Sequence, residues 1–120
     1  MPVQTTVRAV GRTAPRPPHA ERRASARHFC RLEGSCRALP EGRGESWAAT
    51  VRDISADGVG LLLRRRFEPG VLLAVELAVG REARSLLARV VHATAHAGGW
   101  LVGCRFLSPL DEDELRAILL

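Results

Sequence analysis

The chain is divided into short apolar runs that alternate with polar residues and end at turn-forming residues. Six such runs are predicted strands: Phe29–Leu39, Trp47–Ile54, Val59–Leu63, Val71–Val79, Ala83–Thr94 and Trp100–Leu107. Turn residues separate most of them, at Pro40–Gly44, Ser55–Gly58, Glu68–Gly70 and Gly98-Gly99. A strand with one buried face alternates with a period of two, and short strands with Gly-rich turns favour an all-β barrel or sandwich over βαβ units.

The last segment of the chain has the pattern of a helix instead. Ser108 is expected to cap it, Pro109 to occupy its first position, and Asp111 to complete a capping-box-like pair. The acidic run Asp111–Glu114 lies where a helix dipole favours negative charge, so we interpret it as helix electrostatics rather than metal binding or acid catalysis. An apolar stripe follows, formed by Leu110, Leu115, Ile118 and Leu119.

Length and composition indicate one domain preceded by a tail. The 120 residues fit a single domain, and residues 1–20 mix Pro, Arg, Thr and Gly without periodicity. The longest apolar run, Val71–Val79, is interrupted by Glu76 and is too short to cross a bilayer. Three cysteines are too few and too sparse for a disulfide framework. We therefore expect a cytoplasmic protein without membrane insertion.

The charge distribution predicts an anionic partner. The formal net charge is +5 and all 18 strong cations are arginines. They are concentrated in residues 1–66, whereas residues 67–120 carry a small acidic excess. The planar guanidinium group donates two parallel hydrogen bonds and stacks on flat rings, so it suits phosphate and guanine. Nucleotide, nucleic acid and acidic lipid all remain possible partners at this point.

Two short motifs narrow the choice. Arg23-Ala24-Ser25-Ala26-Arg27 is an RxxxR sequence before the first strand, and Asp53-Ile54-Ser55-Ala56-Asp57-Gly58 is a DxSxxG sequence between two strands. Taken singly, the first is a basic linker. The second is a β-turn in which Asp53 and Ser55 bond backbone N–H groups and Gly58 supplies a positive φ. Taken together, they offer arginines for phosphates and for guanine O6 and N7, and a carboxylate for the guanine N–H edge.

With these motifs in this order, residues 21–120 resemble the PilZ domain family. The resemblance extends to Gly58-Val59-Gly60-Leu61, to Val102-Gly103-Cys104-Arg105-Phe106 and to the capped terminal helix. It implies a six-stranded antiparallel β-barrel with a C-terminal α-helix, and cyclic di-GMP as the ligand. It also implies a set of ligand-binding residues: Arg22, Arg23, Arg27, Asp53, Ser55 and Gly58.

The same resemblance implies a role for each of these residues. Arg23 and Arg27 would grip phosphates and bond to or stack on guanine, with help from Arg22. Asp53 and Ser55 would meet a guanine edge and nearby phosphate oxygens, and Gly58 would keep the turn open. Binding would order the N-terminal arginine arm and change the contact with a downstream protein partner that the sequence does not identify.

Other chemically capable residues have simpler explanations. His19, His28, His92 and His96 are scattered and are interpreted as surface residues. Cys30 and Cys36 share a strand face and are expected in the core, and no CxxC spacing supports a zinc site with Cys104. Trp47 and Trp100 are expected in the core or at the rim. Arg64-Arg65-Arg66 is expected to be a solvated strand end. No catalytic motif is found, so we expect neither an enzyme nor a cofactor or metal site.

Two other functions compete with that of a cyclic di-GMP receptor. One is a PilZ-like interaction scaffold that does not bind nucleotide, against which the intact RxxxR and DxSxxG motifs count. The other is a small-barrel protein that binds single-stranded nucleic acid. Aromatic residues make up only 4% of the chain, whereas stacking platforms for single strands use several aromatic side chains. Nucleic acid is therefore not the expected partner.

Overall fold

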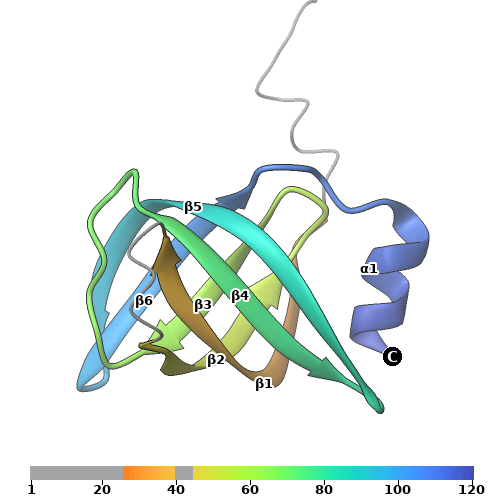
Figure 1. Cartoon of the computed structure of the whole chain (residues 1–120), viewed down its shortest axis with the longest axis horizontal. Coiled ribbons are helices and arrows are strands. Elements are labelled where there is room, and N and C mark those ends of the chain that lie inside the picture. The colour runs from red at the N-terminus through yellow and green to blue at the C-terminus, as the bar shows by residue number, and fades with distance from the viewer. Residues whose placement is uncertain (1–25, 40–44) are drawn as a thin grey trace, which may run out of the picture.

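The computed structural model describes residues 26–39 and 45–120, which form six strands and one helix (Figure 1). The strands are β1 (His28–Leu39), β2 (Trp47–Ile54), β3 (Gly58–Leu63), β4 (Leu72–Val79), β5 (Glu82–His96) and β6 (Gly99–Phe106), and the helix is α1 (Glu112–Leu119). Each predicted strand is confirmed, and its ends differ from the prediction by no more than a residue or two. Arg22, Arg23, the predicted tail 1–20 and the predicted turn Pro40–Gly44 lie outside the described residues.

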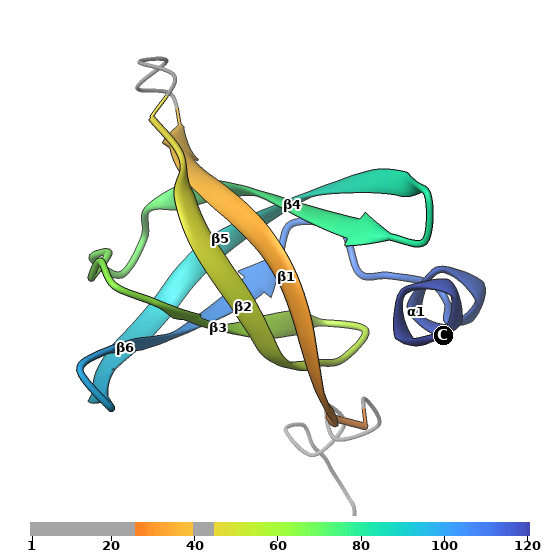
Figure 2. The same ribbon diagram turned by 90° about the horizontal axis from the view of Figure 1, so that it is seen from below.

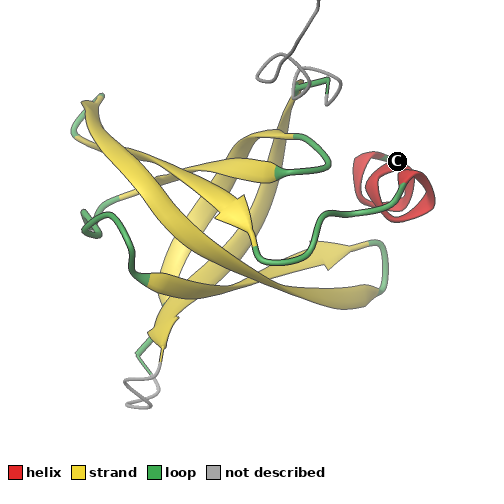
Figure 3. Ribbon diagram, turned by 90° about the horizontal axis from the view of Figure 1, so that it is seen from above, coloured by secondary structure: helices red, strands yellow, loops and turns green. Residues whose placement is uncertain are grey.

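The strands form a closed barrel in the order β1-β2-β3-β6-β5-β4, with every neighbouring pair antiparallel. Pairing of β1 with β4 closes it, so none of the six described strands is left with a free edge. Figure 2 shows the strands wound around one interior, and Figures 1–3 all show α1 beside the barrel. The antiparallel barrel with a C-terminal helix is therefore confirmed. None of the described helices is long and apolar enough to cross a membrane.

The barrel interior holds the inward-facing residue of each alternating pair. Leu61 of β3, Leu73 of β4 and Val102 of β6 have no exposed surface. Burial of a side chain of this size contributes roughly 1.5–3 kcal/mol. Cys36 and Cys104 belong to the same core, and burial raises the pKa of their thiols, to about 11 and about 12 respectively. The outer face of the barrel is then free to carry polar residues.

The two tryptophans are half-buried near strand ends, and arginines cover them. The guanidinium of Arg65 lies 5.1 Å from the centre of the Trp47 ring, and that of Arg66 lies 5.6 Å from the centre of the Trp100 ring. Guanidinium groups are attracted to the faces of aromatic rings at such distances. The tryptophans, predicted to lie in the core or at the rim, pack against the core and remain partly exposed, and two of the three consecutive arginines are in stacking contact as well as solvated.

A β-bulge in β2 places Asp53 on the outer face of the barrel. In the pairing of β2 with β3, Arg52 has no partner and Asp53 pairs with Gly60. The extra residue interrupts the two-residue alternation of the strand. Val51 and Ile54 are both buried in the core although they are three residues apart. Without the bulge, Asp53 would follow Val51 into the interior.

A second bulge has the same effect in β5. In the pairing of β5 with β6, Val91 has no partner and His92 pairs with Gly103. Val90 is buried, and Ala93 packs against the core, so both residues point inward. His92 lies between them in sequence and is exposed on the outer face. Each bulge therefore directs one polar side chain to the outside.

Helix α1 begins later than the sequence suggested. The prediction that Ser108 caps the helix and Pro109 opens it is wrong, because Asp111 is the N-cap. The Asp111 carboxylate accepts a hydrogen bond from Glu114 N at 2.7 Å, and the Glu114 carboxylate accepts one from Asp111 N at 2.9 Å. This reciprocal pair satisfies two backbone donors at the start of the helix. Leu110 and Ile118 are buried, which confirms the predicted apolar stripe.

Candidate functional site

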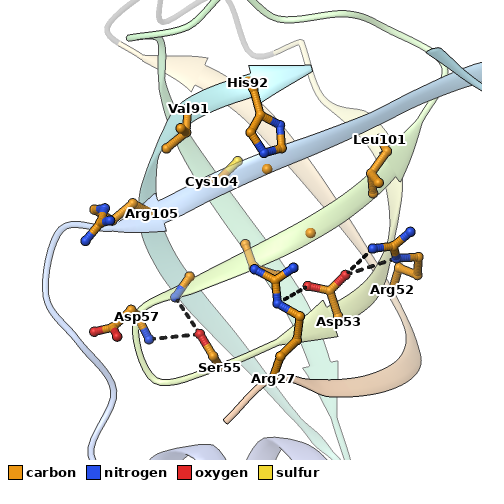
Figure 4. A pocket seen from close by; sticks show the side chains of 14 residues that line it. Arg27, Arg52, Asp53, Ser55, Asp57, Val91, His92, Leu101, Cys104 and Arg105 are labelled. Atoms are coloured by element: carbon orange, nitrogen blue, oxygen red, sulfur yellow. Dashed lines mark hydrogen bonds and ion pairs between the residues drawn. The ribbon is translucent and has the colours of Figure 1, made fainter. Parts of the chain in front are cut away.

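A cavity of about 220 Å³ opens on the outer face of the barrel, where β2, β3, β6 and β5 lie side by side (Figure 4). Four of the six predicted ligand-binding residues line it: Arg27, Asp53, Ser55 and Gly58. The other lining residues are Arg52, Asp57, Val59, Gly60, Val91, His92, Leu101, Gly103, Cys104 and Arg105. The structure thus brings the end of the RxxxR motif and the DxSxxG motif together.

Two glycines form the floor of this cavity. One row of paired residues crosses the four strands: Asp53, Gly60, Gly103 and His92. A Cβ on Gly60 would lie 2.7 Å from Asp53 Oδ2, and a Cβ on Gly103 would lie 2.5 Å from His92 Cε1. The carboxylate and the imidazole therefore occupy the space that the glycines leave. The cavity is a trough with an acidic end and an imidazole end.

Asp53 is a buried carboxylate held by two arginines. Arg52 Nε donates to Asp53 Oδ2 at 3.0 Å, and Arg52 Nη2 lies 2.9 Å from the same oxygen. Arg27 Nε lies 3.5 Å from Asp53 Oδ1. The Asp53 side chain is 3% exposed, whereas that of Arg27 is 64% exposed. The two cations compensate the carboxylate while it is out of water, and Arg27 still faces the solvent from which an anion would arrive.

Arg52 is also oriented by an aromatic neighbour. Its guanidinium lies 5.8 Å from the centre of the Phe29 ring, and Phe29 pairs with Asp53 across β1 and β2. Phe29 itself is 74% exposed. Contact with a ring on one side and a carboxylate on the other fixes the direction of the flat guanidinium group.

The turn after β2 is built around Ser55. The Ser55 hydroxyl oxygen accepts hydrogen bonds from Asp57 N and Gly58 N, each at 3.2 Å, and Ser55 N donates to Gly58 O at 2.9 Å. The prediction that Ser55 bonds backbone N–H groups is confirmed, whereas Asp53, for which the same was predicted, pairs with arginines. No acceptor among the described residues takes the Ser55 hydroxyl hydrogen, so it can donate to an anion.

Gly58 meets a close backbone contact rather than a special turn conformation. Its φ is not positive, so that prediction is wrong. A Cβ at this position would lie 2.3 Å from the carbonyl oxygen of Cys104 on β6. The pairing of Gly58 with Arg105 brings the backbone of β6 against the end of the turn, and only glycine allows this approach.

Sequence reasoning did not find three polar residues of this cavity. Arg52 directly precedes Asp53, the first residue of the DxSxxG motif, so its position beside the motif could have indicated that it belongs to the site. His92 and Arg105 reach the cavity only through the pairing of β5 and β6 with β3. The bulge at Val91 that turns His92 outward has no counterpart in the sequence pattern.

The balance of charges suits an anion that carries hydrogen-bond donors. Three guanidinium groups line the cavity, from Arg27, Arg52 and Arg105, together with two carboxylates, from Asp53 and Asp57. The arginines can bind phosphate oxygens, and the Asp53 carboxylate can accept from N–H groups. Among residues 26–39 and 45–120, no group of three His, Cys, Asp or Glu side chains could hold a metal ion.

Solved structures show where this fold has been seen before. The inhibitor of motility MotI/DgrA of Bacillus subtilis is 20% identical, with a TM-score of 0.62 over 87% of this chain and 53% of that one. The PilZ domain of YcgR from Escherichia coli, solved with c-di-GMP, is also 20% identical, with a TM-score of 0.60 over 82% of this chain and 88% of that one. The MrkH–c-di-GMP complex of K. pneumonia is 17% identical, with a TM-score of 0.55 over 78% and 47%.

These likenesses concern the fold, and this chain spans only about half the length of the MotI/DgrA and MrkH chains. A comparison with curated proteins gave no match. A family model described as the PilZ domain matches residues 21–120, which is most of the chain. Together with the closed barrel and the C-terminal helix, this match shows that the chain belongs to the PilZ domain family.

Proposed function

We propose that this PilZ domain is a receptor for cyclic di-GMP and binds it on the outer face of the barrel, in the cavity between Asp53 and His92. The observation that carries the proposal is the buried Asp53 carboxylate paired with Arg27 and Arg52 beside the Ser55 turn. The structures of the YcgR domain and of MrkH with c-di-GMP support it, because those domains share the fold.

Side chains of this cavity can bind both the phosphates and the guanine bases of the ligand. Arg27 is exposed enough to take a phosphate oxygen or the O6 and N7 atoms of guanine. Asp53 accepts from the N–H edge of the same base, and the Ser55 hydroxyl donates to a nearby phosphate. A charge-assisted hydrogen bond contributes roughly 1.5–3 kcal/mol net. A few of them reach micromolar affinity, about −8.2 kcal/mol, after the cost of ordering the partners.

The cavity alone is too small to enclose a dinucleotide. Its volume of about 220 Å³ is below the roughly 300–1,000 Å³ of pockets that surround a drug-sized ligand. Arg22 and Arg23 come a few residues before Arg27, and we propose that they cover the ligand from outside. Binding would then order the segment that carries them and change the surface that the domain offers to a protein partner.

Calorimetric titration with cyclic di-GMP tests the proposal, with GTP and cyclic di-AMP as competitors of similar chemistry. We expect micromolar, selective binding, and a loss of at least about tenfold in Arg27→Ala, because one or more charge-assisted hydrogen bonds disappear. Arg81→Ala is the matched control, since it removes the same charge from outside the cavity. It should bind like the unmodified protein, and both variants should melt like it.

Two outcomes would reject the receptor role. Absence of heat and of a thermal shift with cyclic di-GMP would favour a scaffold that does not bind nucleotide. Binding of single-stranded oligonucleotides that weakens steeply with salt would favour a nucleic-acid binder instead. The structure already counts against the latter. All five aromatic residues lie in the described part of the chain, and of these only Phe29 is highly exposed.

A further inference from the structure

A β-bulge places His92 at the cavity, just as another β-bulge places Asp53 there. The bulge at Val91 in β5 turns His92 outward, as the bulge at Arg52 in β2 turns Asp53 outward. The two bulged strands flank the β3–β6 pair, so their polar residues face each other across the glycine floor. Bulges are over-represented next to functional sites, where they redirect a side chain.

The imidazole lies over Gly103. Three of its atoms, Cε1, Nε2 and Nδ1, would come within 2.5–3.1 Å of a Cβ at that position. Figure 4 shows the ring above β6, on the same face of the sheet as Asp53 and Arg27. Gly103 has no positive φ that would call for glycine. The residue that benefits from the missing side chain is therefore His92.

The His92 imidazole makes no polar contact that would stabilise the described part of the fold. His92 is exposed, and no hydrogen bond or ion pair joins its ring to another described residue. It belongs to no metal-binding group within the described ranges. The apolar side chains of Val91 and Leu101 also line the cavity, and the Asp53 carboxylate lies across the glycine floor from the imidazole. Because the ring lies over Gly103, its outer face can contact a planar ligand.

We propose that His92 is the base-stacking residue of this site and that its imidazole lies against one guanine ring of the ligand while Asp53 and Arg27 hold the edge of that base. This inference rests on the proposed function. It assigns to His92 a contribution to affinity that neither motif contains. Stacking on a side-chain ring is sequence-tolerant, so the edge contacts select guanine and the stacking contact adds affinity.

Four variants separate stacking from other roles of the residue, with cyclic di-GMP titrated calorimetrically into each. His92→Ala should bind about tenfold more weakly, and His92→Gln equally weakly, because both lack a ring. His92→Phe should stay within about threefold of the unmodified protein. His96→Ala is the matched control, since it removes an exposed imidazole from the same strand outside this cavity. All four should melt like the unmodified protein.

A spectroscopic readout accompanies the affinities. A ring above the base should shift the guanine H8 proton of the bound ligand upfield in the unmodified protein and in His92→Phe, but not in His92→Ala. If His92→Ala binds as tightly as the unmodified protein, or if His92→Gln keeps the affinity that His92→Phe loses, stacking by His92 is wrong while the receptor role stands. If the unmodified protein binds no cyclic di-GMP, the receptor role and this inference are both overturned.

Discussion

Gly58 and Gly60 stand two residues apart in β3, yet alanine should have different effects at the two positions. A Cβ on Gly60 meets Asp53 Oδ2 at 2.7 Å, and this oxygen belongs to a side chain that can rotate away. We therefore expect Gly60→Ala to keep the fold and to displace the carboxylate from Arg52, with roughly tenfold weaker binding of cyclic di-GMP. Titration together with a thermal melt measures both effects.

Gly58→Ala serves as the counterpart of this variant. Its Cβ would meet the backbone oxygen of Cys104 at 2.3 Å, and that oxygen cannot move without disturbing the β3–β6 pairing. Overpacking of this kind costs roughly 1–3 kcal/mol, so the variant should melt several degrees lower. A Gly60→Ala protein that binds normally would show that the position of Asp53 does not matter for the ligand.

The sequence was informative about single residues where chemistry is local. Ser55 could be assigned to turn hydrogen bonds because its partners are two and three residues away. Asp53 could be assigned to the site by its motif, but its pairing with Arg52 and Arg27 could not. His92 was interpreted as a surface residue. The assignment was correct as to exposure, but its position opposite Asp53 depends on strand pairing across the barrel.

At the level of strands and helix, the alternation of apolar residues was sufficient to locate each strand. It holds because every strand has one face in the same interior. The bulges at Arg52 and Val91 could not be predicted, since they are properties of how two strands pair and not of either strand alone. The start of α1 was also misjudged, because Ser108 and Asp111 both have capping chemistry and only the latter has Glu114 three residues ahead.

The Asp111 cap should be measurable as helix stability. Asp111→Ala removes the acceptor for Glu114 N and should lower the free energy of unfolding by about 1 kcal/mol. Leu110 N also donates to Ala56 O at 2.8 Å, which joins the start of α1 to the turn that carries Ser55. Urea unfolding should show the loss, while the affinity for cyclic di-GMP stays unchanged because α1 does not line the cavity.

Asp113→Ala is the control for this change, because it removes the same charge from the same turn of the helix. Its carboxylate pairs with Arg116 at 3.3 Å, but both side chains are exposed, and such pairs contribute little. Equal destabilisation by the two variants would mean that the dipole, and not the capping hydrogen bond, is the source of the effect.

On the scale of the whole molecule, the site exists only after β3 has paired with β6. Its residues come from the β2–β3 hairpin and from the β5–β6 hairpin, which the pairing of β3 with β6 joins. The closed barrel also buries Cys36 and Cys104 in its interior, at 1% and 6% exposure. Residues that the sequence separates widely thus share either the outer site or the inner core, and neither arrangement follows from local pattern.

The burial of the Cys36 and Cys104 thiols leads to a prediction about stability at alkaline pH. The chain has no Tyr, and all 18 of its strong cations are arginines. Cysteine is therefore the residue type in this chain whose ordinary pKa lies nearest to the range between about pH 9 and 11. Burial raises the pKa of Cys36 from 9.0 to about 11 and that of Cys104 from 9.0 to about 12, because it disfavours the thiolate.

The direction of the change in stability depends on which state, folded or unfolded, loses its thiol protons at the lower pH. Unfolded thiols ionise near pH 9, before the folded ones, so the stability that the two thiols contribute is fully present below that pH and falls above it. The fall is about 1.4 kcal/mol per pH unit for each thiol, until the pH passes the folded pKa of about 11 for Cys36 and about 12 for Cys104. Urea unfolding at about pH 8 and at about pH 10.5 measures it.

A double variant, Cys36→Ala with Cys104→Ala, isolates the cause. It should be less stable than the unmodified protein at about pH 8, because two cavities are left in the core, but its stability should change far less by about pH 10.5. Cys30→Ala removes a thiol that is only half-buried and should retain most of the alkaline loss. A double variant that loses as much stability as the unmodified protein would mean that the two core thiols already ionise in the folded barrel, and that its interior is open to water at alkaline pH.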